Sequence, residues 1–163
     1  MSPAADHIAL RTAFGHFPTG VAAVCAQGPI GPTGMVVSTF VAVSLDPPLI
    51  AVFLQSTSST WPVLRSCDRI GVSVLAAGHD EAARSLSRRT GDRFAGVRHS
   101  TTDAGAVRIA GCSAWFDCAL DREVEAGDHT MALMRVLAHD SDGGVTAPLV
   151  VHRSKFGSVT RAA

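Results

Sequence analysis

The sequence lacks a surplus of charge of either sign. Its 14 acidic residues balance 14 basic ones, and Lys155 is the only lysine. Proteins that bind nucleic acid or an anionic membrane over an extended surface carry a basic surplus. The balance argues against either partner for the chain as a whole and leaves only local basic pockets open. Asparagine and tyrosine are absent too, a bias typical of a GC-rich genome.

Cysteines in a metal-binding spacing are also missing. Cys25, Cys67, Cys112 and Cys118 form no CxxC pair, and no neighbouring histidine completes a zinc pattern. Unpaired cysteine is among the residue types most often buried. We therefore expect buried free thiols and no metal site.

No unbroken apolar run is long enough to cross a membrane. The most apolar stretch, residues 35–54, is interrupted by Ser38, Thr39, Ser44 and the Asp46-Pro47-Pro48 turn. The first eleven residues contain acidic and basic side chains in place of the apolar segment of a signal peptide. We therefore expect a reduced, cytoplasmic protein that does not bind membranes.

The apolar content is sufficient for one hydrophobic core. The 163 residues are 47% hydrophobic, which suits a single domain spanning residues 1–163. An N-terminal helix is predicted, with Ser2 as its cap and Pro3 at its first position. Gly15 and Pro18 are expected to end it.

Most of the remaining chain has the pattern of strands separated by turns. Apolar and polar residues alternate at the start of residues 112–126, which predicts a strand with one buried face. Two polar segments, residues 58–67 and 79–89, predict short helices. The strands are expected at residues 20–27, 34–44, 49–55, 69–75, 112–126, 129–138 and 148–152. About six to eight strands at this spacing predict a mainly β fold closed as a barrel, with short helices.

A glycine series at Gly28, Gly31 and Gly34 is not a nucleotide-binding loop. A dinucleotide fingerprint requires GxGxxG between a strand and a helix, whereas these glycines lie between two predicted strands. We interpret them as a flexible hairpin loop. Neither a Rossmann domain nor a Walker A motif is predicted.

Hydroxyl groups are concentrated in two places. Ser38, Thr39 and Ser44 lie on one predicted strand, and residues 55–60 read Gln-Ser-Thr-Ser-Ser-Thr just before a predicted helix. Such a cluster suits phosphate oxygens. It equally suits plain capping, with Ser58 or Ser59 at the helix start and the other hydroxyls in water. The residues alone leave both interpretations open.

A series of short motifs extends along nearly the whole chain. Residues 17–21 read Phe-Pro-Thr-Gly-Val, residues 34–40 Gly-Met-Val-Val-Ser-Thr-Phe, and residues 43–49 Val-Ser-Leu-Asp-Pro-Pro-Leu. Further motifs follow at Ser59-Thr60 and at residues 92–96, 127–130, 148–150 and 153–157. Together they resemble the short-chain NAD(P)H:flavin reductases, which are the reductase components of two-component flavin-dependent monooxygenases. The resemblance implies an FMN-binding split β-barrel.

The resemblance also implies which residues hold the flavin. Residues 35–40 would follow the isoalloxazine ring and ribityl chain, and residues 55–60 would hold the ribityl hydroxyls and phosphate. The implied flavin-binding residues are Met35, Val36, Val37, Ser38, Thr39, Phe40, Ser44, Gln55, Ser56, Thr57, Ser58, Ser59, Thr60 and Phe94. Val36 stands where relatives often carry Thr, and Thr39 where they often carry Ser. The missing hydroxyl at position 36 predicts weaker flavin binding.

The nicotinamide site is implied in the same way. His129, in the Gly127-Asp128-His129 turn, would lie near the nicotinamide and is the one catalytic candidate. The implied nicotinamide-binding residues are Pro32, Thr33, Gly34, His129, Arg153, Phe156 and Gly157. Two simpler interpretations stay open: Phe156 as a core residue and His129 as an ordinary turn histidine.

The function implied by the resemblance is hydride transfer from NADH or NADPH to FMN or FAD. The cofactors supply that chemistry, so no catalytic triad or metal is required. The expected partners are a second copy of the chain, as a homodimer, and a monooxygenase that receives the reduced flavin. Two alternatives are a split barrel that binds flavin tightly without reductase turnover and a barrel without any cofactor.

Overall fold

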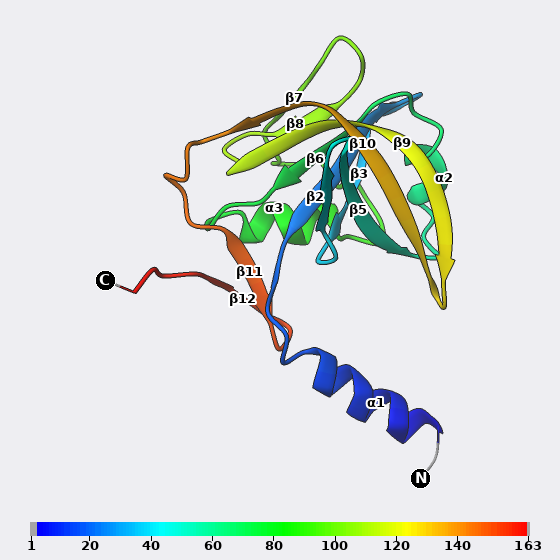
Figure 1. The fold of residues 1–163 in the computed structure, drawn as a ribbon, viewed down its shortest axis with the longest axis vertical. Coiled ribbons are helices and arrows are strands. Elements are labelled where there is room, and N and C mark those ends of the chain that lie inside the picture. Colours follow the sequence, from blue (N-terminus) through cyan, green and yellow to red (C-terminus); the bar gives the residue numbers. More distant parts are fainter. Residues whose placement is uncertain (1–2, 163) are drawn as a thin grey trace.

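The computed structural model describes residues 3–162 as an antiparallel β structure with three helices (Figure 1). The main sheet has seven strands in the order β3-β2-β6-β9-β10-β5-β4, while β1, β11 and β12 form a second sheet and β7 and β8 a hairpin. The strands are β1 (Thr19–Gly20), β2 (Ala22–Gly28), β3 (Gly31–Val37), β4 (Val41–Leu45), β5 (Pro48–Gln55), β6 (Ile70–Val74), β7 (His99–Thr101), β8 (Val107–Ile109), β9 (Ala114–Ala126), β10 (His129–Ser141), β11 (Leu149–His152) and β12 (Lys155–Ser158). The helices are α1 (Pro3–Phe14), α2 (Trp61–Leu64) and α3 (Asp80–Leu86).

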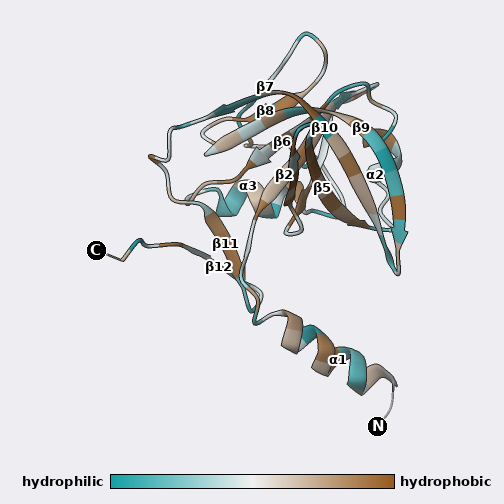
Figure 2. Cartoon of the chain, viewed as in Figure 1, coloured by the Kyte–Doolittle hydropathy of each residue, from teal (hydrophilic) through white to brown (hydrophobic). Residues whose placement is uncertain are grey.

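Strand β2, next to the edge strand β3, is buried on both faces. Val24 belongs to a first core cluster, and its neighbours Ala23 and Cys25 belong to a second. This follows from the alternation of side chains along a strand. Figure 2 shows hydrophobic residues along most of β5 and much of β2.

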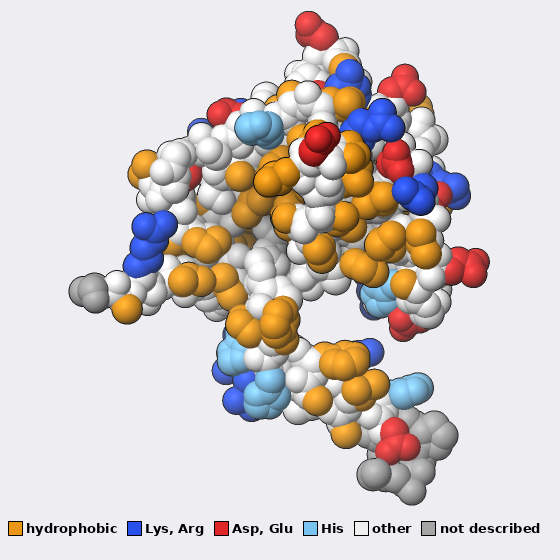
Figure 3. Space-filling model, in the orientation of Figure 1, with side chains coloured by type: hydrophobic (Ala, Val, Ile, Leu, Met, Phe, Trp, Pro, Cys, Tyr) orange, Lys and Arg blue, Asp and Glu red, His pale blue; other side chains and the backbone are white. Residues whose placement is uncertain are grey.

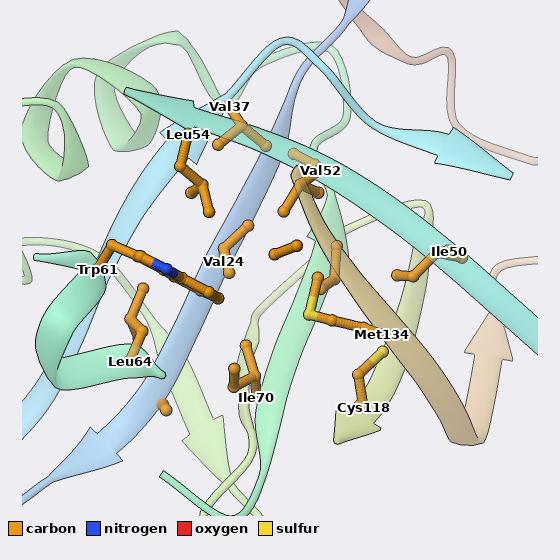
Figure 4. Close-up of a cluster of buried hydrophobic side chains, with 14 residues drawn as sticks. Val24, Val37, Ile50, Val52, Leu54, Trp61, Leu64, Ile70, Cys118 and Met134 are labelled. Carbon is orange, nitrogen blue, oxygen red and sulfur yellow. The ribbon is translucent and has the colours of Figure 1, made fainter. Parts of the chain in front are cut away.

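The first core cluster fills the space between β2, β5 and α2. Ile50, Val52 and Leu54 of β5 converge on it with Trp61 and Leu64 of α2 (Figure 4). The second cluster includes residues from α3 and from the C-terminal sheet, among them Leu86 and Leu149. The two clusters therefore hold α2 and α3 against the strands.

Several predicted elements form. Residues 58–67 and 79–89 contain α2 and α3, and the strands expected at 49–55, 69–75 and 112–126 form as β5, β6 and β9. Four short strands, β1, β7, β8 and β12, were not predicted, because two to four residues are too few to show a period. The predicted cap Ser2 lies outside the described residues.

The prediction of one strand over residues 34–44 is wrong. β3 ends at Val37 and β4 begins at Val41, and they occupy opposite edges of the main sheet. Between them, the Thr39 hydroxyl donates to the Phe53 carbonyl and accepts from the Phe53 N–H, at 2.8 and 3.0 Å. The Thr39 side chain thus bonds to the Phe53 N–H and C=O, which the backbone of a neighbouring strand would otherwise do. Because apolar residues flank Thr39 on both sides, the break between the two strands cannot be seen in the sequence.

The glycine series forms a hairpin turn only in part. Gly28 and Gly31 pair across the β2–β3 turn, as expected of a loop between strands. Gly34, by contrast, is a buried residue within β3. A side chain there would collide with the Cys25 sulfur, so Gly34 is required for close packing and not for flexibility.

All four cysteines are free thiols, as predicted. Cys25, Cys112 and Cys118 are buried, whereas Cys67 is partly exposed. Burial raises the pKa of Cys25 to about 12. This thiol therefore stays protonated at neutral pH and acts as a small apolar side chain.

α1 projects away from the barrel (Figure 1). Every described side chain of residues 4–14 is exposed, including Ile8, Leu10 and Phe14. Of the helices among residues 3–162, none has the length and apolar character to cross a membrane.

Candidate functional site

A groove of about 550 Å³ opens where the ends of β3 and β5 meet the loop before α2. One wall is the C-terminal end of α3 and the residues that follow it, and His129 closes the groove at the start of β10. The groove is lined by Met35, Val36, Val37, Ser38, Thr39, Phe53, Leu54, Gln55, Thr57, Ser58, Ser59, Thr60, Leu86, Ser87, Arg89, Arg93 and His129. Most of the predicted flavin-binding residues therefore gather in one place.

The loop at residues 55–60 both caps α2 and presents hydroxyls to the groove. The Ser58 hydroxyl accepts from the Trp61 N–H at 3.2 Å, the contact expected of a serine at the helix start, while the N-cap residue itself is Thr60, whose side chain makes no capping hydrogen bond. Ser59 is exposed and lines the groove. Ser56 does not line it; the Ser56 N–H donates to the Asp128 carbonyl at 2.9 Å. Capping thus occupies one hydroxyl and leaves others for a ligand.

Arg93 connects three segments around the groove. Its Nη1 donates to the Gly34 carbonyl at 3.0 Å and to the Thr60 hydroxyl at 2.7 Å, and its Nε donates to the Arg88 carbonyl at 2.6 Å. These contacts fix the guanidinium in place, and Nη2 makes no hydrogen bond within residues 3–162. A second cation, Arg89, is exposed and lines the same groove.

Sequence reasoning missed both arginines. The only signal was a basic run after α3, with Arg88 and Arg89 four or five residues before Arg93. Of the motif at residues 92–96, the resemblance implies only Phe94 as a flavin-binding residue. Phe94 is instead a residue of the second core cluster, in edge contact with His99, and it lines a hollow on the far side of Arg93.

A second hollow, of about 440 Å³, adjoins the groove and is mainly apolar. The two share Ser38, Thr39 and Phe53, and the second is otherwise lined by Phe17, Pro18, Thr19, Gly20, Val21, Ala22, Phe40, Val41 and Val74. Ser38 is exposed between them, whereas the Thr39 hydroxyl is already bonded to Phe53. The site therefore has a polar, cationic part and an apolar part.

His129 is oriented by its neighbour. Its Nδ1 lies 2.7 Å from the Asp128 carboxylate, and the hydrogen bond from His129 lowers the pKa of that carboxyl. An ionised carboxylate can only accept, so Nδ1 carries the proton and Nε2 is the free ring nitrogen. His129 therefore lines the groove with its Nδ1 bonded to Asp128, and its role as the nicotinamide contact stays a prediction.

Other predicted residues lie outside the groove. Ser44 lies at an irregularity in the pairing of β4 with β5 and lines neither hollow. Phe40 lines only the apolar hollow and stacks on Phe116, with ring centroids 5.7 Å apart. These two residues do not contact the polar part of the site.

The predicted nicotinamide residues are divided among three places. His129 lines the groove, whereas Pro32, Thr33 and Gly34 line the hollow beyond Arg93. Arg153, Phe156 and Gly157 line a third hollow on the β11–β12 hairpin. The expectation that all of these residues border one cleft is not met within a single chain, because β11 pairs with β1 and holds the hairpin away from the groove. Their binding role stays a prediction.

Phe156 has a structural role in this fold. It packs against the second core cluster, and the Arg84 guanidinium lies 5.3 Å from its ring centroid.

Among residues 3–162, no group of His, Cys, Asp or Glu is arranged to hold a metal ion.

Comparison with known proteins identifies similar chains. Residues 14–160 match the flavin reductase like domain. The chain is 36% identical to the stachydrine N-demethylase reductase subunit Stc3 of Rhizobium meliloti, over 85% of this chain and 60% of that protein. It is 34% identical to a flavin reductase of Pseudomonas putida, over 90% of this chain and 86% of that one. It therefore spans nearly all of some relatives and about half of others, 45% in one case.

A solved structure shares the fold. The NADH:FAD oxidoreductase SgcE6 of Streptomyces globisporus C-1027, in complex with NAD and FAD fragments, superposes with a TM-score of 0.88 at 33% identity. The match covers 100% of this chain and 96% of that one. The prediction of a mainly β split barrel with short helices is thereby confirmed.

Proposed function

The chain belongs to the flavin reductase-like family, and we propose that it is an NAD(P)H:flavin oxidoreductase. It would transfer a hydride from NADH or NADPH to FMN or FAD and supply the reduced flavin to a partner monooxygenase. The observation that carries the proposal is the two-part site, in which cations and hydroxyls adjoin an apolar hollow. A flavin nucleotide has the matching parts: an anionic phosphate, a hydroxylated chain and an aromatic ring.

The polar part fits the phosphate. Ser59 offers an exposed hydroxyl, and Arg93 offers a guanidinium held in place by its contacts to Gly34 and Thr60. Hydrogen bonds between arginine and phosphate are charge-assisted and directional, so a fixed guanidinium binds without further ordering. Arg89 adds a second positive charge beside them.

The segment between the two hollows fits the hydroxylated chain and the ring. Ser38 and Gln55 are exposed at the groove and can meet the ribityl hydroxyls. The apolar hollow beside Phe17 and Val41 can receive the edge of a flat aromatic ring. Val36 also lines the groove and packs against the second core cluster. A partly buried apolar side chain therefore stands at the position where the resembling family often carries Thr.

The chemistry asks little of the protein. A bound flavin supplies the hydride acceptor, and the reduced nicotinamide supplies the hydride. The chain must hold the two rings in contact and keep water away, for which the apolar hollow is suited. His129 lines the groove with its Nδ1 bonded to Asp128, and it is our candidate for the nicotinamide contact. We also propose a cytoplasmic homodimer, the assembly that the resemblance implies.

A steady-state assay tests the activity. The purified chain is mixed with FMN or FAD and with NADH or NADPH, and nicotinamide oxidation is followed for each pair. We expect turnover that depends on added flavin, with saturation in both substrates. The proposal fails if no pair supports turnover, or if flavin co-purifies at one per chain and is not reduced by either nicotinamide.

A further inference from the structure

A small hollow adjoins the groove on the far side of Arg93. It measures about 210 Å³ and is lined by Pro32, Thr33, Gly34, Thr60, Gly91, Asp92, Arg93 and Phe94. Pockets that enclose a complete ligand usually measure about 300–1,000 Å³. The hollow therefore has the size for one part of a ligand whose remainder lies in the groove.

Two side chains line both spaces and form a junction between them. Arg93 and Thr60 contribute to the groove and to the hollow, and Nη1 of Arg93 donates to the Thr60 hydroxyl at 2.7 Å. Within residues 3–162, Nη2 of Arg93 donates to no group, and the Thr60 hydroxyl accepts without donating. Both side chains therefore retain a hydrogen-bond donor where the two spaces meet. A junction of donors suits a diphosphate that passes from one space into the other.

The positive charge beside this junction is local. Arg89 and Arg93 both line the groove, although the chain as a whole has no net charge. On the barrel face that Figure 3 shows, Lys and Arg side chains are interspersed with acidic ones. An anionic nucleotide is therefore attracted to the groove and its junction more than to the surface at large.

Beyond the junction, the hollow carries a carboxylate. Asp92 is exposed, and its Oδ1 accepts from the Phe94 N–H at 2.9 Å. Its Oδ2 makes no hydrogen bond within residues 3–162. In dinucleotide sites a carboxylate binds a ribose hydroxyl, whereas it repels a phosphate. The hollow therefore fits a ribose whose hydroxyls are free.

The rest of the hollow is uncharged. Pro32 and Thr33 on β3 are partly exposed, and Pro32 provides an apolar surface on which a flat base can lie. Gly91 adds no side chain to the wall, and its φ of 83° disfavours any other residue there. Donors at the junction, a carboxylate and an apolar surface match a diphosphate, a ribose and a base in that order.

We propose that the preferred flavin is FAD, with its diphosphate at the junction of Arg93 and Thr60 and its adenosine in the hollow. The inference rests on the proposed function and names its flavin substrate. FMN ends at a single phosphate, so it fills the groove and makes no contact in the hollow. The assignment replaces the nicotinamide role implied for residues 32–34, because His129, the candidate nicotinamide contact, lines the groove and not the hollow.

Flavin titrations of the purified protein test the assignment. Isothermal titration calorimetry gives the Kd for each flavin, and we expect a Kd about 10-fold lower for FAD than for FMN. Asp92→Asn keeps an oxygen for the Phe94 N–H and removes the charge that binds the ribose. The Kd for FAD should then rise several-fold, while the Kd for FMN changes little. Asp103→Asn, at an exposed turn, is the matched control.

A second pair of variants changes the space in the hollow. Thr33→Gln places a longer uncharged side chain in the wall, and it should bring the Kd for FAD close to that for FMN. Thr33→Ser shortens the side chain and should keep the preference for FAD. Circular dichroism shows whether each variant is folded, so the assignment stays testable if Asp92→Asn is not.

Three results overturn the assignment. The first is an equal Kd for FAD and FMN in the wild type, and the second is a folded Asp92→Asn protein that binds both flavins as the wild type does or loses both alike. The third is a rise of KM for NADH alone in Asp92→Asn with FMN as acceptor, which would place the adenosine of the nicotinamide cofactor in the hollow. None of these results bears on the proposed function, which depends on flavin reduction in the steady-state assay.

Discussion

At the scale of single residues, Arg93 decides how the polar part of the site is held together. Its guanidinium contacts Gly34 on β3, Thr60 before α2 and Arg88 after α3. No other described side chain of the groove makes hydrogen bonds to three segments so distant in the sequence. Arg93 therefore places a positive charge in the groove and also holds three segments of the groove together.

Replacing Arg93 by methionine should weaken FMN binding. A charge-assisted hydrogen bond contributes about 1.5–3 kcal/mol, which corresponds to roughly a 10- to 150-fold higher Kd. Riboflavin lacks the phosphate, so its Kd should rise only a few-fold through the loss of positioning. Fluorescence titration measures both ligands. The exposed Arg98, changed to methionine, is the matched control, and equal losses for FMN and riboflavin would contradict a phosphate contact.

Asp128 acts through His129. Changing Asp128 to alanine removes the acceptor of the Nδ1–H, so the imidazole loses its fixed tautomer and orientation. We expect KM for NADH to rise several-fold while the flavin Kd changes little. A second Asp128→Ala change added to His129→Ala should then have no further effect, because the two residues act as one unit. Asp103→Ala, at an exposed turn, serves as control, and additive effects of the pair would argue against coupling.

At the scale of elements, α2 is too short to be stable through its own hydrogen bonds. It has four residues, and it is held by Trp61 and Leu64, which are 6% and 0% exposed. Glu123 on β9 adds a polar anchor: it accepts from the Trp61 indole N–H at 2.7 Å and pairs with Arg65 at 2.6 Å. The loop that carries Ser59 is therefore positioned by a residue outside the groove.

Two changes at Glu123 separate these contacts. Glu123→Ala leaves the Trp61 N–H without its partner, which costs about 1–3 kcal/mol. It should lower the Tm and raise the Kd for FMN. Glu123→Gln keeps an acceptor and loses only the ion pair with the half-exposed Arg65, so we expect it to behave nearly as wild type. Thermal melts and FMN titrations measure both effects. Glu125→Ala on the same strand is the control, and a stable Glu123→Ala with normal FMN binding would show that α2 needs no polar anchor.

At the scale of the whole molecule, the β7–β8 hairpin lies directly over β6. Ile109 donates its N–H to the Ser73 hydroxyl at 3.0 Å, and the Trp115 indole N–H donates to the Val107 carbonyl at 3.3 Å. This approach is possible because Gly71 has no side chain. A Cβ at Gly71 would overlap the Val107 carbonyl oxygen.

Gly71→Ala should therefore destabilise the entire fold. Backbone atoms cannot move aside as a flexible side chain can, so we expect a loss of about 1–3 kcal/mol or more. Gly20→Ala is the matched control, because a Cβ there meets no atom within 4 Å. Urea unfolding compares the two. Equal stability of both variants would mean that the hairpin shifts without cost.

The sequence by itself determined the elements with a strong local signal. Three segments are rich in β-forming residues and have the length of a strand, and each becomes a strand: residues 49–55, 69–75 and 112–126. Motif order along the chain also identified the family and most of the residues around the groove. These inferences succeed because periodicity and short motifs are local properties, which are readable without knowing what lies opposite.

Only the tertiary structure decided the features that depend on partners distant in sequence. β3 and β4 are separate strands where the Thr39 hydroxyl bonds to the backbone of Phe53. Arg93 lies in the site because its guanidinium bonds to Gly34 and Thr60. The separation of Arg153 from His129 likewise follows from which strand β11 pairs with. A sequence specifies these contacts only through the whole fold, since each requires two segments brought together by packing elsewhere in the chain.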